Sequence, residues 1–220
     1  MDASTAAASG PNARSGVGFN LALIALGAAI LGLLAAYGID ALRQGGQAAK
    51  AGTVTRTLGG QRLEIPAAWL RSEAGAGTGF AKQVELVLRL PLGPGGALSD
   101  IAVTLMPRSR ARPSAALLDG VYLHQFMPEQ LSGPPGLVGK PLVARDGMAG
   151  ETVWYDALSP RPFVAKCAAP VVADAPGRCL RTVHLGPGLA AVYSFGADVL
   201  AEWRRFDAVL APPLETIGAL

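Results

Sequence analysis

The sequence is poor in the residues that most often carry chemistry. It has two cysteines and two histidines, His124 and His184, and it contains no H-E-x-x-H or C-x-x-C motif. It also lacks a G-x-S-x-G elbow, a P-loop and a dinucleotide-binding fingerprint. The sequence therefore predicts no catalytic residue, no metal site and no cofactor.

Charged residues are also sparse, at 16% of the chain, and only four of the 19 basic residues are lysines. The arginines are scattered along the chain, whereas a nucleic-acid-binding protein gathers its basic residues on one face. We therefore expect no nucleic-acid partner. Apolar residues make up half of the chain and the mean hydropathy is +0.34, which excludes a disordered protein.

The hydrophobicity is concentrated in residues 15–39, which contain no charged side chain. A helix of this length spans the roughly 30 Å hydrocarbon layer of a membrane. The run favours an uncleaved signal anchor over two alternatives, a cleaved signal peptide and a buried soluble helix. It divides the chain into a cytoplasmic tail (1–14), a transmembrane anchor (15–39), a tether (40–52) and a folded domain (53–220).

The cysteines, Cys167 and Cys179, flank a segment rich in Pro and Gly, as if they faced each other across a hairpin. A disulfide between them, with a Cα separation of roughly 4.4 to 6.8 Å, is the favoured interpretation. Two unpaired buried thiols are the alternative, and a zinc site lacks the further ligands it needs. A disulfide indicates an oxidising compartment. The basic residues that follow residues 15–39 favour a cytoplasmic domain instead. We give the cysteine pair more weight, and so expect a bacterial inner-membrane protein with a periplasmic domain.

The folded part mixes two periodicities. Residues 84–90 and 101–105 alternate apolar and polar side chains, which predicts a hairpin. Pro113 opens a predicted helix over residues 113–127, and five short apolar runs between residues 137 and 195 predict an antiparallel meander. An amphipathic helix is predicted over residues 197–211, with Pro212 and Pro213 ending it. The expected fold class is α+β: one transmembrane helix, then one mostly antiparallel sheet with two packed helices.

Both ends of this domain resemble a known family. The opening LGGQRLEIPAAWL and the closing AVYSFGADVLAEWRRFDAVLAPPLETI are similar to the first and last segments of the PsbP-like α/β/α sandwich family. Members of that family are mostly non-enzymatic adaptors or membrane-associated proteins, so the resemblance implies a binding or assembly role.

One charged motif stands out, PRSRARP, in which Arg108, Arg110 and Arg112 alternate after a predicted strand. In an extended chain they would share one side and form a patch that binds an anion, a lipid headgroup or a partner, and a solvated strand end is the alternative. The leading function is a membrane-anchored periplasmic domain that binds a partner protein or assembles an envelope complex. The alternatives are a domain that binds a small ligand or lipid, and a hydrolase whose residues are dispersed in the sequence.

Overall fold

The structure is a computed structural model that describes residues 52–71, 79–144, 150–170, 177–186 and 188–220. All of these residues belong to one compact unit, Lys50–Leu220. The predicted tail (1–14), the predicted anchor (15–39) and nearly all of the tether lie outside the described residues. Within the described ranges, no helix is long and apolar enough to cross a membrane.

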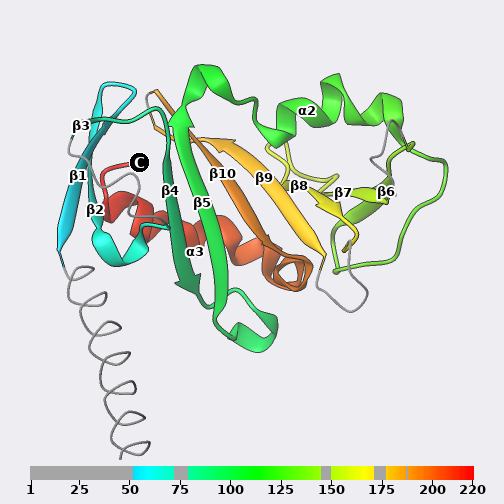
Figure 1. The fold of residues 1–220 in the computed structure, drawn as a ribbon. Coiled ribbons are helices and arrows are strands. Elements are labelled where there is room, and N and C mark those ends of the chain that lie inside the picture. Colours follow the sequence, from blue (N-terminus) through cyan, green and yellow to red (C-terminus); the bar gives the residue numbers. More distant parts are fainter. Residues whose placement is uncertain (1–51, 72–78, 145–149, 171–176, 187) are drawn as a thin grey trace, which may run out of the picture. The chain divides into compact units, whose positions relative to one another are not determined.

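Seven strands form the larger sheet, and every neighbouring pair in it is antiparallel. Their order is β4–β5–β10–β9–β8–β7–β6 (Figure 1). The strands are β4 Val84–Leu90, β5 Ser99–Pro107, β6 Val138–Pro141, β7 Glu151–Tyr155, β8 Val164–Ala168, β9 Arg178–His184 and β10 Leu189–Gly196. The predicted meander is confirmed as β6 to β10, and the predicted hairpin as β4 and β5. Strand β10 pairs with β5 and so joins the two parts.

A smaller sheet has the order β2–β1–β3, with β1 Thr53–Leu58, β2 Gln61–Pro66 and β3 Gly79–Phe80. The β1–β2 hairpin turns at Gly59 and Gly60, whose φ angles of 59° and 85° are left-handed and favour glycine. The backbone N–H of Glu64 in β2 donates to the Ile217 carbonyl at 3.1 Å, which ties this sheet to the chain that follows the last helix.

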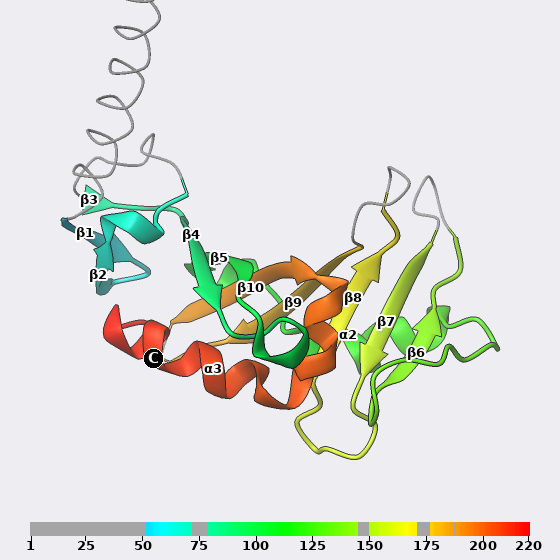
Figure 2. The same ribbon diagram turned by 90° about the horizontal axis from the view of Figure 1, so that it is seen from below.

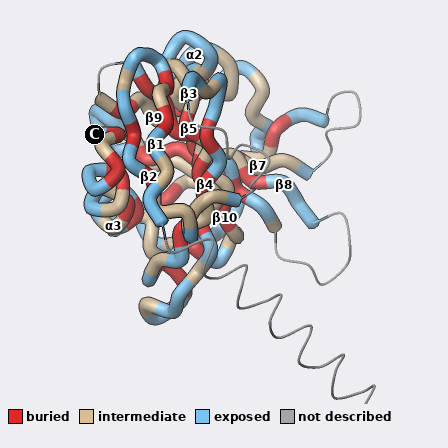
Figure 3. Tube along the Cα trace, turned by 60° about the vertical axis from the view of Figure 1, so that its left-hand side comes forward, coloured by how far each residue is buried: buried red, intermediate tan, exposed pale blue. Residues whose placement is uncertain are grey.

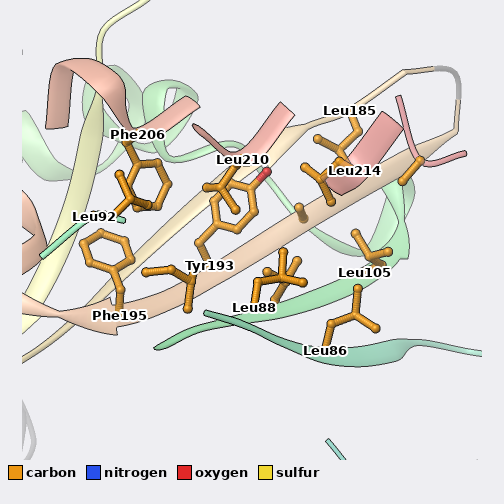
Figure 4. Packing of buried hydrophobic residues seen from close by; sticks show 14 of the residues in the cluster. Leu86, Leu88, Leu92, Leu105, Leu185, Tyr193, Phe195, Phe206, Leu210 and Leu214 are labelled. Atoms are coloured by element: carbon orange, nitrogen blue, oxygen red, sulfur yellow. The ribbon is translucent and has the colours of Figure 1, made fainter. Parts of the chain in front are cut away.

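The last helix, α3 (Trp203–Thr216), lies along one face of the larger sheet (Figure 2). Its buried residues Phe206, Leu210 and Leu214 pack over the sheet, where Tyr193 and Phe195 of β10 face them (Figure 4). In Figure 3 buried stretches recur along the strands and along α3, with exposed residues between them. The main core therefore lies between the sheet and α3.

The predicted end of this helix is wrong. The α-helix begins at Trp203, after a 3₁₀ turn over Ala197–Glu202 (η6), and continues through Pro212 and Pro213 to Thr216. A proline lacks an N–H donor, but its own carbonyl still accepts hydrogen bonds from later residues. The Ile217 N–H donates to the Pro213 carbonyl at 3.3 Å, so the final turn forms beyond both prolines.

The other helix, α2 (Ser114–Gly120), covers the opposite face of the sheet. Its Leu118 packs in a second cluster with Val153 of β7, whereas the next residue, Trp154, packs against the main core. Successive residues of a strand point to opposite faces, so the two helices lie on different sides. The helix is shorter than predicted, because it ends at Gly120 and is followed by a 3₁₀ turn over Tyr122–Gln125 (η5).

The expected fold class is therefore wrong. The described residues are mostly sheet, with ten strands in two separate sheets where one sheet was expected, and they contain two α-helices. None of these helices could span a membrane. The smaller sheet was missed because its Gly-Gly turn was not recognised as a hairpin signal.

Candidate functional site

The larger sheet divides between β8 and β9. The two strands are paired from Ala168↔Arg178 to Lys166↔Leu180, and beyond Leu180 only β10 continues to pair with β9, as far as His184. The backbone N–H of Thr182 donates instead to the hydroxyl of Ser114, at 2.8 Å. Ser114 is buried at the start of α2, so its side chain occupies the place of a strand partner.

A cleft of about 730 Å³ lies where the strands diverge, a size typical of small-molecule sites. Its walls come from the end of β9, from α2, from the β7–β8 loop over residues 159–162, from Arg108 after β5 and from Asp207 of α3. The cleft has three guanidinium groups, on Arg108, Arg161 and Arg181, and two carboxylates, on Asp119 and Asp207. Because positive charge is in excess, the cleft favours an anionic occupant.

Arg181 is the unusual residue of this site, since it is an arginine with only 6% of its surface exposed. Its Nη2 donates to Asp207 Oδ2 at 2.7 Å, and its guanidinium carbon lies 4.4 Å from the centre of the Phe163 ring. Its Nε–H is buried and has no hydrogen-bond partner among the described residues. An unpaired buried donor costs about 1–3 kcal/mol, so the position of Arg181 is costly for the fold alone.

Arg108 and His184 form a second polar group in the cleft. The Nε of Arg108 donates to Nδ1 of His184 at 2.7 Å, and Nε2 of His184 lies 2.9 Å from the carbonyl of Ala111. Because Nδ1 accepts a hydrogen bond, the ring hydrogen is on Nε2 and is donated to Ala111. His184 therefore has both nitrogens engaged and acts as a positioning group for the exposed Arg108.

Two tyrosines, Tyr193 of β10 and Tyr122 of η5, have raised pKa values. Burial raises the pKa of Tyr193, and the nearby charge of Asp207 raises it further, while Arg181 lowers it. Burial, followed by the charge of Glu151, raises the pKa of Tyr122. Both phenols thus serve as hydrogen-bonding or packing groups and not as bases.

The arginines expected to form one patch have separate environments. Residues 108–110 form a 3₁₀ turn (η4), so the extended geometry expected for the motif is wrong. Arg108 contacts His184, Arg110 Nη1 donates to the carbonyl of Lys82 at 3.3 Å, and Arg112 is exposed. Of the three, Arg108 lines the cleft. A role for Arg110 and Arg112 in binding an anion or a partner stays a prediction.

The predicted disulfide between Cys167 and Cys179 is confirmed. The two residues are directly opposite each other on β8 and β9, with 3.9 Å between their Cα atoms. This is shorter than the expected range of roughly 4.4 to 6.8 Å. It is also shorter than the roughly 4.5 to 5.5 Å between opposite Cα atoms of antiparallel strands.

No group of three His, Cys, Asp or Glu residues that could hold a metal ion occurs in the part of the chain that the structure describes. His124 is exposed on the turn after α2, and His184 lies in the cleft. The sequence analysis missed Ser114, Arg181 and Asp207. Arg181 could have been found, because it alternates with Cys179 and Val183 at inward positions of a predicted strand, where a charged residue is unusual.

Comparison with known proteins found no match among family models, curated proteins or solved structures. The resemblance to the PsbP-like family therefore stays a prediction from the sequence.

Proposed function

We propose that this domain binds a small anionic ligand in the cleft between β9, α2 and the β7–β8 loop. The observation that carries the proposal is the buried Arg181, with its unpartnered Nε, in the wall of a cleft that also contains Arg108 and Arg161. Guanidinium groups bind carboxylates and phosphates through paired, charge-assisted hydrogen bonds. Small-ligand binding was the second function that the sequence indicated.

The arrangement of polar groups favours binding over hydrolysis. Ser159, His184 and Asp207 line the same cleft, which are the residue types of a catalytic triad. However, His184 uses its nitrogens for Arg108 and Ala111, and the Ser159 hydroxyl accepts a hydrogen bond from the backbone N–H of Arg161 at 3.2 Å. A general base for Ser159 would require these contacts to be rearranged.

The test is a titration calorimetry series with inorganic phosphate, sulfate and acetate at constant ionic strength. Arg108→Gln and Arg161→Gln change exposed side chains, so we expect both variants to fold normally. Each should weaken binding by up to about fivefold, which corresponds to the roughly 0.2–1 kcal/mol of an exposed charge pair. Arg89→Gln is the matched control, because Arg89 is exposed on β4 and does not line the cleft. Equal weakening in all three variants, or no binding of any probe by the wild type, would refute the proposal.

Contact with a partner protein, the function that the sequence favoured first, is a second candidate. The segment over residues 125–131 runs antiparallel to residues 139–143, and this outer part of the sheet exposes apolar side chains. The exposed apolar residues there are Met127, Leu131 and Val143, and Leu123 is exposed in the preceding η5 turn. A Met127→Ser/Leu131→Ser variant that retains its thermal midpoint should lose a cross-linked partner that the wild type forms in cells. An unchanged cross-linking pattern would exclude this surface.

We also propose that the domain lies in the periplasm. Its support is the disulfide, because such bonds persist in oxidising compartments. A periplasmic domain predicts an active alkaline phosphatase fusion after residue 220 and an inactive cytoplasmic fluorophore at the same position. The reverse pattern would place the domain in the cytoplasm.

A further inference from the structure

A second cavity, of about 290 Å³, adjoins the cleft. The two share three lining residues, Val183, His184 and Asp207. The cavity lies on the α3 side of the sheet, since its other walls are formed by α3 and β10, by Leu185 just after β9 and by Leu220 after α3. The residues that line only this cavity are Leu185, Tyr193, Leu210, Ala211, Leu214 and Leu220.

The chemistry of the second cavity differs from that of the cleft. Five of the six residues particular to it are aliphatic, and the sixth is Tyr193, a protonated phenol. Figure 4 shows the Tyr193 hydroxyl between Leu210 of α3 and Leu185, with Leu214 beside them. No guanidinium or ammonium group lines this cavity among the described residues. Such walls accept an apolar group and penalise a buried charge.

Asp207 lies at the boundary between the two spaces. It lines both of them, and its side chain remains 64% exposed while it pairs with Arg181. A carboxylate at this boundary repels a second anionic group that would enter the apolar cavity. The combination selects for a ligand with charge at one end only.

We infer that the ligand of the cleft is an amphiphilic anion, whose charged head contacts Arg108 and Arg181 and whose short aliphatic or aromatic group enters the adjoining cavity. This inference rests on the proposed function, because it describes the ligand of the same cleft. It adds the chemical class: a carboxylate or phosphate with one apolar substituent of limited length. A carboxylate and a phosphate ester can each supply the anionic head, and the experiment below shows which of the two the cleft prefers.

The test compares short and long members of each class in titration calorimetry at constant ionic strength. The pairs are acetate with hexanoate, and inorganic phosphate with hexyl phosphate. The longer member of the preferred class should bind at least about tenfold more tightly, because burying even part of its added methylene chain gives that gain. Adipate, which has the length of hexanoate but a carboxylate at each end, should lose the gain.

A pair of variants on α3 locates the apolar group. Ala211 lines the cavity and is half-buried, so Ala211→Leu fills part of the cavity and should reduce hexanoate or hexyl phosphate binding to the level of the short anion. Ala208→Leu is the matched control, because Ala208 is exposed on the same helix and does not line the cavity. It should leave both affinities unchanged.

The outcomes separate this inference from the proposed function. If acetate or phosphate binds and depends on Arg108, but the longer ligands gain nothing, the amphiphilic ligand is refuted and the anion site stands. A chain-length gain that persists in Ala211→Leu also refutes the inference, because the apolar group then lies elsewhere. If none of the anions binds, the proposed function itself fails.

Discussion

Removing the disulfide between Cys167 and Cys179 should cost the domain a large part of its stability. The two residues are 12 apart in the sequence, and a crosslink that closes a loop of this size removes unfolded-state entropy worth about 3 kcal/mol in the chain-entropy model. For a domain of this length, 1 kcal/mol shifts the thermal midpoint by roughly 2–4 °C. The Cys167→Ala/Cys179→Ala variant should therefore melt about 6–12 °C below the wild type.

The assay is thermal and urea denaturation followed by circular dichroism, with and without dithiothreitol. Dithiothreitol should lower the midpoint of the wild type to near that of the double variant, and should leave the double variant unchanged. Cys179 is fully buried and Cys167 is 7% exposed, so complete reduction is verified by thiol titration in denaturant. The oxidised wild type, which has no free thiols, is compared with the double variant. A difference below about 2 °C between their thermal midpoints would refute the entropic argument, because the closed loop would then contribute less than about 1 kcal/mol.

Three further changes test other parts of the structure. Ser114→Ala removes the acceptor for the Thr182 N–H and should cost about 1–3 kcal/mol in urea denaturation; a cost near zero would mean that water replaces the hydroxyl. Gly139→Ala places a methyl group against the Trp154 ring and should destabilise the domain by about 1–3 kcal/mol, with reduced tryptophan fluorescence anisotropy if the ring is displaced. Burial raises the pKa of Tyr193, so its contribution to stability is complete below its ordinary pKa of about 10 and is lost as the pH rises above that value. Urea midpoints between about pH 8 and pH 11 should fall less steeply in Tyr193→Phe than in the wild type, and equal slopes would contradict the raised pKa.

The parts of the fold that could be predicted from the sequence are those with a local signal. Alternating apolar residues gave the hairpin of β4 and β5 and the five-strand meander, because one buried face imposes a period of two on each strand. The pairing of β10 with β5 has no such signal, since about 80 residues separate the strands in sequence. The predicted end of the last helix was wrong because Pro212 and Pro213 were expected to stop it, whereas the Pro213 carbonyl still accepts a hydrogen bond from the Ile217 N–H.

The candidate site could be predicted only in part, because its contacts join distant segments. Arg108 was singled out in the sequence, but its partner His184 is 76 residues away. Arg181 and Asp207 meet only because α3 crosses over the face of β9, a packing choice that neither residue's neighbours indicate. Local patterns specify which face of a strand is buried, and they leave the choice of partner to the tertiary fold.

The division of the sheet, on which the cleft depends, nevertheless has a cause in the sequence. If the register of Lys166↔Leu180 continued, Val164 would lie opposite Thr182 and Pro162 opposite His184. Proline has no N–H and cannot supply a ladder hydrogen bond to the carbonyl of His184, so β8 cannot pair with β9 as far as His184. Pro160 repeats the obstacle two residues earlier. The loop must then turn away from β9, the Ser114 hydroxyl accepts from the Thr182 N–H, and the side chains of Arg181 and His184 gain a cavity beside them.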